Sequence, residues 1–361
     1  MQDNAMSKWL APLMAFCLSF IIIATLAPIT GIQFDRQLDF WLLWLGSMLL
    51  LALPIGYLEI ALVKRAKTTA LQALSSLTRE ADSSQKWRLA GWLAVIFMPF
   101  LAGAILANAS QLLQQWALPN IADTAILLGL MLLALLLSLL PRLILLVLTL
   151  LGVLAALVLA QFSDIQLPAW QLTTVQFSEW GSATVLALVA SGLGLGVYAQ
   201  SSLSYIQQQK VATKTALPIW IAQLLAVIAF AYFAVQAAWP AWALLCAAVM
   251  GAALLLQLAR EQLQARQMAA VVQWLIVILV TAVWLIPNVS LWFNSLLMLW
   301  GLSICLMYTI FVGWIMKISH LRKAMNFSNE VFYNIWRICV RVINPLAIIT
   351  AMLAVLGNLP L

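Results

Sequence analysis

Apolar segments of about 20 residues recur from one end of the chain to the other, and this is the length of helix that crosses the hydrocarbon core of a bilayer. Only short polar connections separate them. Transmembrane β-strands would instead alternate apolar and polar residues over about ten positions. The sequence therefore predicts an all-α, polytopic membrane helix bundle. Hydropathy windows place about eleven transmembrane helices, at residues 8–30, 39–63, 89–115, 122–140, 143–161, 180–205, 216–238, 240–258, 268–287, 291–316 and 336–357.

The balance of apolar and charged residues excludes a soluble protein, because 65% of the residues are hydrophobic and only 8% are charged. No connection between the predicted spans is long enough for a separate soluble fold. We therefore interpret residues 1–361 as a single integral membrane domain in the lipid bilayer.

Catalytic chemistry has little support in the sequence. The four cysteines lie inside apolar segments, which indicates buried small side chains rather than disulfides or metal ligands. His320 is the only histidine, so the chain has neither a zinc-binding histidine pair nor a thiol–histidine pair. We predict no enzymatic activity and no cofactor.

The basic residues are distributed on one side of the predicted bundle. With the N-terminus in the cytoplasm and the C-terminus outside, only Arg36 among the 18 Lys and Arg residues lies on the outer side. We expect a multi-pass protein of the bacterial inner membrane with this orientation. The longest inner connection, residues 64–88, is interpreted as a solvated loop or, alternatively, as a surface for anionic lipid or a partner. Aromatic residues are not interleaved with its basic ones, so nucleic acid is not an expected partner.

Glu59, in "LPIGYLEIALVKR", is the best candidate for a functional charge at membrane depth. Two interpretations are open. The carboxylate pairs with Lys64 one turn later or caps loose backbone, or it has a gating or coupling role.

The sixth predicted span contains the stretch "SGLGLGVYAQSS", residues 191–202. Each glycine in a helix interior costs roughly 1 kcal/mol relative to alanine, so three at alternate positions weaken the helix at its centre. Close helix packing through Gly192 and Gly196 is one explanation. The polar residues that follow favour another, a break whose exposed backbone lines a substrate or ion site. The candidate residues are Ser191, Gly192, Gly194, Gly196, Tyr198 and Ser201.

These features resemble the neurotransmitter:sodium symporter family. The family has a glycine-rich break followed by aromatic and small polar residues in its sixth helix, as here. Three further residue spacings are similar to those of the family. The second span has Pro54, Glu59 and Lys64, the end of the tenth span has Trp314 followed by Asn326, and the eleventh span has Arg341 followed by Pro345. The chain is identified as a divergent, compact member.

The resemblance implies the LeuT fold, with inverted five-helix repeats at 8–161 and 180–316 and an eleventh helix at 336–357. It implies a central site between breaks in helices 1 and 6, and a Glu59 side chain that bonds the backbone exposed there. The activity implied is sodium-coupled transport of amino acids or related amines.

Three segments depart from the family's pattern. The first span reads "FIIIATLAPITG" where the family has a glycine- and asparagine-rich break, which leaves Thr25, Pro28, Thr30 and Gly31 to loosen or line a site. The third span, "FLAGAILANAS", has no tyrosine, and "ALLCAAVMG" stands where hydroxyl residues complete a sodium site. The family's sodium ligands are therefore not matched, and sodium is not assigned as a cofactor.

Three functions remain open at this point, one of which is a membrane enzyme or channel. The first is secondary transport of a small, amino-acid-like solute. The alternative is a transporter-derived membrane scaffold, assembly partner or sensor that no longer transports and acts through a membrane protein partner.

Overall fold

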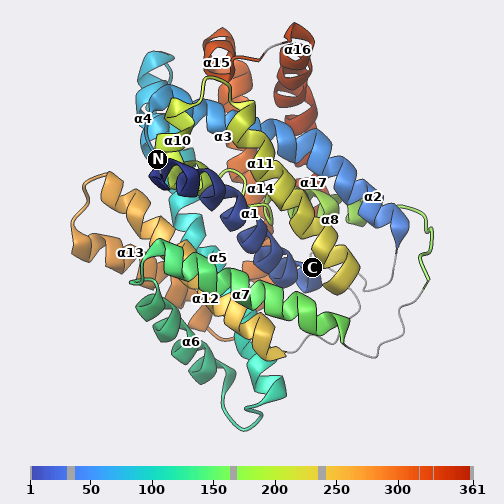
Figure 1. Ribbon diagram of the computed structural model, residues 1–361. Helices are drawn as coiled ribbons and strands as arrows, with labels where there is room; N and C mark the ends of the chain where they lie inside the picture. Colours follow the sequence, from blue (N-terminus) through green and yellow to red (C-terminus); the bar gives the residue numbers. More distant parts are fainter. Residues whose placement is uncertain are drawn as a thin grey trace.

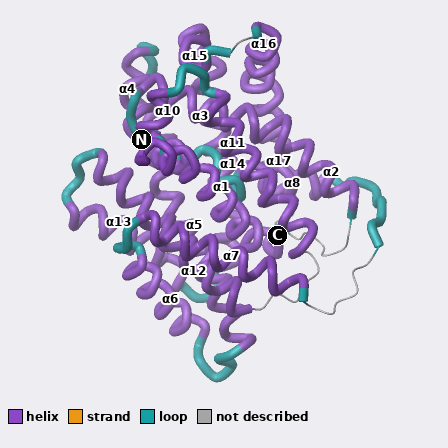
Figure 2. Tube along the Cα trace, viewed as in Figure 1, coloured by secondary structure: helices purple, strands orange, loops and turns teal. Residues whose placement is uncertain are grey.

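The computed structural model describes residues 2–30, 37–162, 169–234, 241–316, 318–327 and 329–357. Within this part of the chain the backbone is helical almost throughout, and the one bridge between extended residues joins Gln37 to Gln171. Figure 2 shows helix in every layer of the molecule, with loops confined to the connections. The predicted polytopic all-α bundle is confirmed.

Seventeen α-helices make up the described bundle (Figure 1). Their bounds are α1 Gln2–Ile29, α2 Leu38–Ser47, α3 Leu53–Ala66, α4 Ala70–Glu80, α5 Leu89–Trp116, α6 Asp123–Leu137, α7 Arg142–Gln161, α8 Phe177–Leu188, α9 Val197–Ser201, α10 Leu203–Gln208, α11 Thr213–Ala229, α12 Ala241–Ala265, α13 Ala270–Ala282, α14 Ser290–Ile310, α15 Ile318–Met325, α16 Glu330–Ile338 and α17 Asn344–Gly357.

These helices reproduce the predicted spans in order. Among the described residues, 8 helical segments are long and apolar enough to cross a membrane, and α6 and the α13 segment are shorter apolar helices. The remaining span is the interrupted helix formed by α8, α9 and α10. Some spans combine two labelled helices because a π-helical turn lies between them, as at Met48–Ala52 and Cys339–Ile343.

The centre of the bundle contains α5 and α12, which pack against each other, and α1, which packs against both of them and against α11. Glycine allows α7 to approach this centre closely, since a side chain at Gly152 of α7 would meet the Ala247 backbone of α12 at 3.0 Å. Around this centre, α6 and α13 present leucine, isoleucine and valine side chains outward, as expected where the neighbour is lipid.

The first span differs from the resemblance, because α1 runs without interruption from Gln2 to Ile29. Its sequence has no glycine at the expected break, and the Thr25 hydroxyl donates to the Ile21 carbonyl of the same helix at 2.9 Å. Pro28 lies in the last turn, so the hydrogen bond that its missing N–H removes falls at the end of the helix and not in its middle. The expected break in helix 1 is therefore wrong for the described residues. Gly31 and Arg36 lie outside the described residues.

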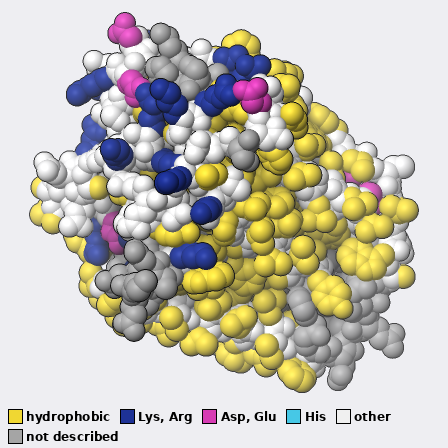
Figure 3. All heavy atoms as spheres, turned by 45° about the horizontal axis from the view of Figure 1, so that its top comes forward, with side chains coloured by type: hydrophobic (Ala, Val, Ile, Leu, Met, Phe, Trp, Pro, Cys, Tyr) yellow, Lys and Arg dark blue, Asp and Glu magenta, His cyan; other side chains and the backbone are white. Residues whose placement is uncertain are grey.

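One end of the bundle, here named the basic end, gathers the last residues of α3, α10 and α12 with the start of α7. Lys64 Nζ donates to the Lys210 carbonyl at 2.7 Å, and Arg142 pairs with Glu261. Figure 3 shows Lys and Arg side chains concentrated on one part of the surface, beside a broad hydrophobic area. The predicted loop at 64–88 lies at this end but contains the amphipathic helix α4.

Candidate functional site

The sixth span is interrupted at its glycines. Helix α8 ends at Leu188 and α9 begins at Val197. Between them Gly192, Gly194 and Gly196 adopt left-handed φ values of 65°, 83° and 67°. L-residues with a Cβ rarely adopt this conformation. The predicted break is confirmed, and the alternative of a continuous packing face through Gly192 and Gly196 is wrong.

Close contacts add a second reason for glycine. A Cβ at Gly192 would lie 2.8 Å from the Tyr198 hydroxyl, and one at Gly194 would lie 2.7 Å from Ile304 Cγ2 on α14. The break is therefore packed tightly against its neighbours rather than open around its glycines.

Glu59 reaches this break from α3. Its buried carboxylate accepts hydrogen bonds from the backbone N–H groups of Gly194 and Gly196. Lys64 is engaged elsewhere, with the Lys210 carbonyl. The geometry is that of the backbone cap, as the resemblance implied, and not of a Glu59–Lys64 pair.

Two other helices stabilise the carbonyl groups of the break. The Ser191 carbonyl accepts from the Tyr198 hydroxyl and from Gln223 Nε2 of α11, both at 2.9 Å. The Leu195 carbonyl accepts from Gln262 Nε2 of α12 at 3.1 Å. An unpaired backbone group inside a membrane protein is costly, so these amides compensate for the missing helical bonds.

The hydroxyl groups of the stretch are also engaged. Ser191 Oγ lies 3.5 Å from the Met48 sulfur, and Ser201 Oγ donates to the Val197 carbonyl at 3.0 Å. The Thr25 carbonyl accepts from Asn108 Nδ2 of α5 at 3.3 Å. Six of the eight predicted site residues thus lie together at the break, whereas Thr25 bonds its own helix and α5.

The space beside Glu59 is small. A cavity of ≈ 10 Å³ lies against Glu59, Gly194, Gly196 and Tyr308, enough for about one water molecule. The buried Tyr308 hydroxyl has no hydrogen-bond partner among the described residues. A water can therefore occupy this cavity, but an amino acid cannot.

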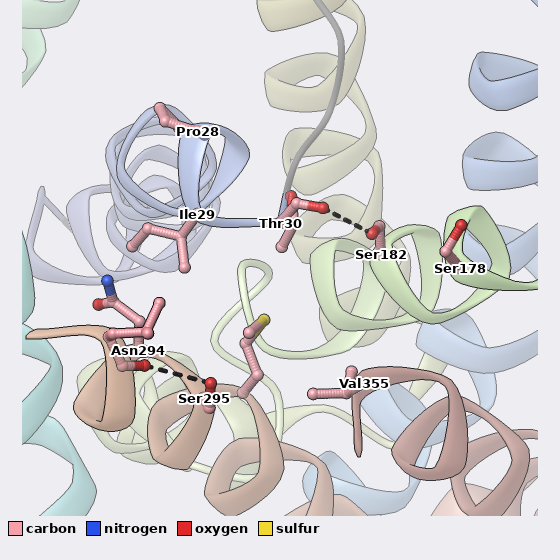
Figure 4. A pocket seen from close by; sticks show the side chains of 10 residues that line it. Pro28, Ile29, Thr30, Ser178, Ser182, Asn294, Ser295 and Val355 are labelled. Atoms are coloured by element: carbon pink, nitrogen blue, oxygen red, sulfur yellow. Dashed lines mark hydrogen bonds between the residues drawn. The ribbon is translucent and has the colours of Figure 1, made fainter. Parts of the chain in front are cut away.

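A larger cavity lies at the end opposite the basic end (Figure 4). It measures ≈ 300 Å³ and is lined by Pro28, Ile29, Thr30, Ser178, Ser182, Leu291, Asn294, Ser295, Met298 and Val355. The predicted residue Pro28 belongs to this cavity and not to the break. The lining comes from the last turn of α1, the start of α8, the start of α14 and the end of α17.

Polar groups in this larger cavity, here named the outer cavity, are held in defined positions. Ser182 Oγ donates to the Thr30 carbonyl at 2.9 Å, and Ser295 Oγ donates to the Leu291 carbonyl at 3.2 Å. Asn294 Oδ1 has no hydrogen-bond partner among the described residues. No lining side chain carries a formal charge. The outer cavity is thus lined by neutral hydrogen-bonding residues, and one of them, Asn294, has a buried carbonyl oxygen without a partner among the described residues.

Sequence reasoning missed the polar residues that complete both regions. Gln223 stands inside the predicted span 216–238, where a polar residue is a recognisable signal, whereas Gln262 follows the span 240–258 in the polar stretch "REQLQAR". Ser182 and Asn294 stand near predicted span ends, where polar residues are ordinary. Among the described residues no group of three or more His, Cys, Asp or Glu side chains is placed to bind a metal ion.

Comparison with known proteins supports the architecture. No protein-family model and no curated protein sequence matches the chain. Among solved structures, the chain is similar to MhsT in complex with L-phenylalanine, with a TM-score of 0.58 and 14% identity over 95% of this chain and 98% of that one. The similarity shows the LeuT fold for nearly the whole chain.

Proposed function

We propose that the protein is a secondary transporter of a small, amino-acid-like solute, which it receives in the outer cavity. The observation that carries the proposal is the cavity itself, ≈ 300 Å³ of space in a LeuT-fold bundle with serine, threonine and asparagine residues in its lining. The solved neighbour MhsT is in complex with L-phenylalanine, which supports the same class of solute.

The termini of four helices give the outer cavity a polarity that suits a zwitterion. The lining includes the first turns of α8 and α14, whose N-termini carry partial positive charge. It also includes the last turns of α1 and α17, whose carbonyl ends carry partial negative charge. A carboxylate is favoured toward the N-termini and an ammonium group toward the carbonyl ends.

The break connects this cavity to the rest of the bundle. Helix α8 contributes Ser178 and Ser182 to the cavity and ends just before the glycines. A solute that moves α8 therefore acts on the segment that Glu59 caps. In this proposal the break is the hinge of the transport cycle.

Uptake by proteoliposomes tests the proposal. The purified chain is reconstituted and supplied with a panel of labelled amino acids, with and without a sodium gradient, and with a proton gradient alone. Saturable uptake above that of empty liposomes is expected for at least one amino acid. Comparison of uptake with and without the sodium gradient tests sodium coupling. This comparison is needed because the family's sodium ligands are not matched in this sequence.

A non-transporting membrane scaffold is the second candidate. Two observations favour it, namely the uninterrupted α1 and the bonding of the break's polar groups to the chain's own side chains. No uptake of any amino acid, no thermal shift with any of them and a copurifying membrane protein would replace the transporter by the scaffold.

A further inference from the structure

A second pocket of substantial size lies at the basic end, between α4 and the end of α12. It measures ≈ 310 Å³ and is lined by Gln72, Ser75, Ser76, Arg79, Ala265, Arg266 and Gln267. The lining includes two guanidinium groups and two hydroxyl groups, and it includes no carboxylate. Such a set of donors suits an anion.

The wall formed by α4 is fixed to the bundle. Its buried side chains Ala73, Leu74 and Leu77 face the core, and α4 packs against α5 and α12. The Gln72 amide donates to the Ala265 carbonyl at the end of α12. The two walls of the pocket are therefore joined before any ligand arrives.

The two arginines are placed for an external anion. The Arg266 guanidinium lies over the Trp92 ring of α5, 5.0 Å from its centroid, which restrains the side chain without neutralising it. In the described part of the chain, the ion pairs engage other basic residues, which are Arg65 with Glu80, Arg142 with Glu261 and Arg322 with Glu330. Arg79 and Arg266 have no carboxylate partner among these residues.

We propose that this pocket binds the phosphate group of an anionic phospholipid. Arginine presents a planar fork that matches phosphate oxygens, and serine hydroxyls add further donors. The position favours a lipid over a free anion, because Trp92 stands near the start of the span Gln85–Trp116, the depth at which aromatic residues meet lipid headgroups. The basic face around it attracts anionic headgroups (Figure 3). This binding does not depend on transport activity.

Lipid binding to the purified, full-length chain in detergent tests the proposal. Native mass spectrometry compares dioleoyl phosphatidylglycerol with dioleoyl phosphatidylcholine on the wild type and on the Arg79→Gln, Arg266→Gln double variant. A direct charge-assisted hydrogen bond at a partly exposed site contributes about five-fold in affinity, so loss of both arginines is expected to weaken phosphatidylglycerol binding about thirty-fold. Phosphatidylcholine binding is expected to be the same for both proteins.

A matched control removes equal charge from residues 64–88 but outside the pocket. The exposed residues Lys67 and Lys86 serve here, and Lys67→Gln with Lys86→Gln is expected to change phosphatidylglycerol binding by about two-fold or less. The single variant Arg79→Gln, at an exposed position, is expected to lose about five-fold and covers the case in which the double variant fails to fold.

Three results would overturn the proposal. In the first, the pocket variants bind phosphatidylglycerol as tightly as the wild type. In the second, the control variant loses as much affinity as the pocket variant, which would indicate general charge attraction. In the third, inorganic phosphate displaces no lipid yet stabilises the protein through Arg79 and Arg266, which would identify a free phosphate as the ligand.

Discussion

The Glu59 carboxylate accepts a hydrogen bond from the backbone N–H of Gly194, 135 residues further along the chain. It joins α3 to the break between α8 and α9, and the bond to Gly196 doubles the connection. A buried N–H without a partner costs about 1 to 3 kcal/mol, so this one side chain offsets a large part of the cost of interrupting the helix.

Replacement of Glu59 tests its role as a cap. Gln retains one carbonyl acceptor, so Glu59→Gln is expected to lower the free energy of unfolding in detergent by about 1 to 3 kcal/mol, and Glu59→Leu by about 2 to 6. Glu330, which is largely exposed, supplies the control, since Glu330→Leu is expected to cost under about 1 kcal/mol. Equal losses for Gln and Leu at position 59 would contradict the role.

The left-handed backbone at Gly194 predicts a strong effect of a single methyl group. Gly194→Ala is expected to lower the free energy of unfolding by about 2 to 5 kcal/mol, from the left-handed φ and from the contact with Ile304 together. Gly46 lies within helix α2, and a Cβ there meets no atom within 4 Å. Gly46→Ala should therefore be neutral or stabilising by about 1 kcal/mol. Similar losses at both glycines would argue against a strained break.

The two donors on the Ser191 carbonyl predict a non-additive pair of variants. Tyr198→Phe or Gln223→Met leaves the carbonyl one partner, and each is expected to cost about 0.5 to 1.5 kcal/mol of unfolding free energy. The double variant leaves it none, so the loss should exceed the sum of the single losses by about 1 kcal/mol or more. Simple additivity in this double-mutant cycle would show that the donors do not share one acceptor.

The outer cavity predicts a transport phenotype without a folding defect. Asn294→Leu replaces a polar lining residue by a larger apolar one, and amino-acid uptake is expected to fall about ten-fold, the equivalent of one lost polar contact. Leu296 is lipid-exposed on the same helix and offers the control, since Leu296→Phe should preserve uptake. Unfolding temperature in detergent verifies that both variants are folded. Undiminished uptake by Asn294→Leu would exclude the cavity from the solute's route.

The order of the spans could be predicted from the sequence because hydropathy reports directly on burial in lipid. The break could also be predicted, because Gly192, Gly194 and Gly196 destabilise the interior of a helix. The helix α4 was not predicted, although Ala73, Leu74 and Leu77 follow a helical spacing, because the basic residues around them indicated a loop.

The partners of the break could not be predicted in the same way. Gln223 and Gln262 meet it only through the packing of α11 and α12, and a local pattern does not contain that geometry. The outer cavity depends on four helix ends that are distant in sequence. The break expected in the first span rested on the resemblance alone. This span has no glycines at the expected position, and α1 is a continuous helix there.

The uninterrupted α1 has a mechanical consequence. Between Pro12 and Pro28 it has neither proline nor glycine, so this stretch is a stiff rod of about 24 Å. A tilt of about 5° about the middle of this rod displaces its two ends by about 1 Å in opposite directions. A tilt that widens the outer cavity at Pro28 therefore shifts the Pro12 end of the helix the opposite way, and the two ends are coupled through one helix.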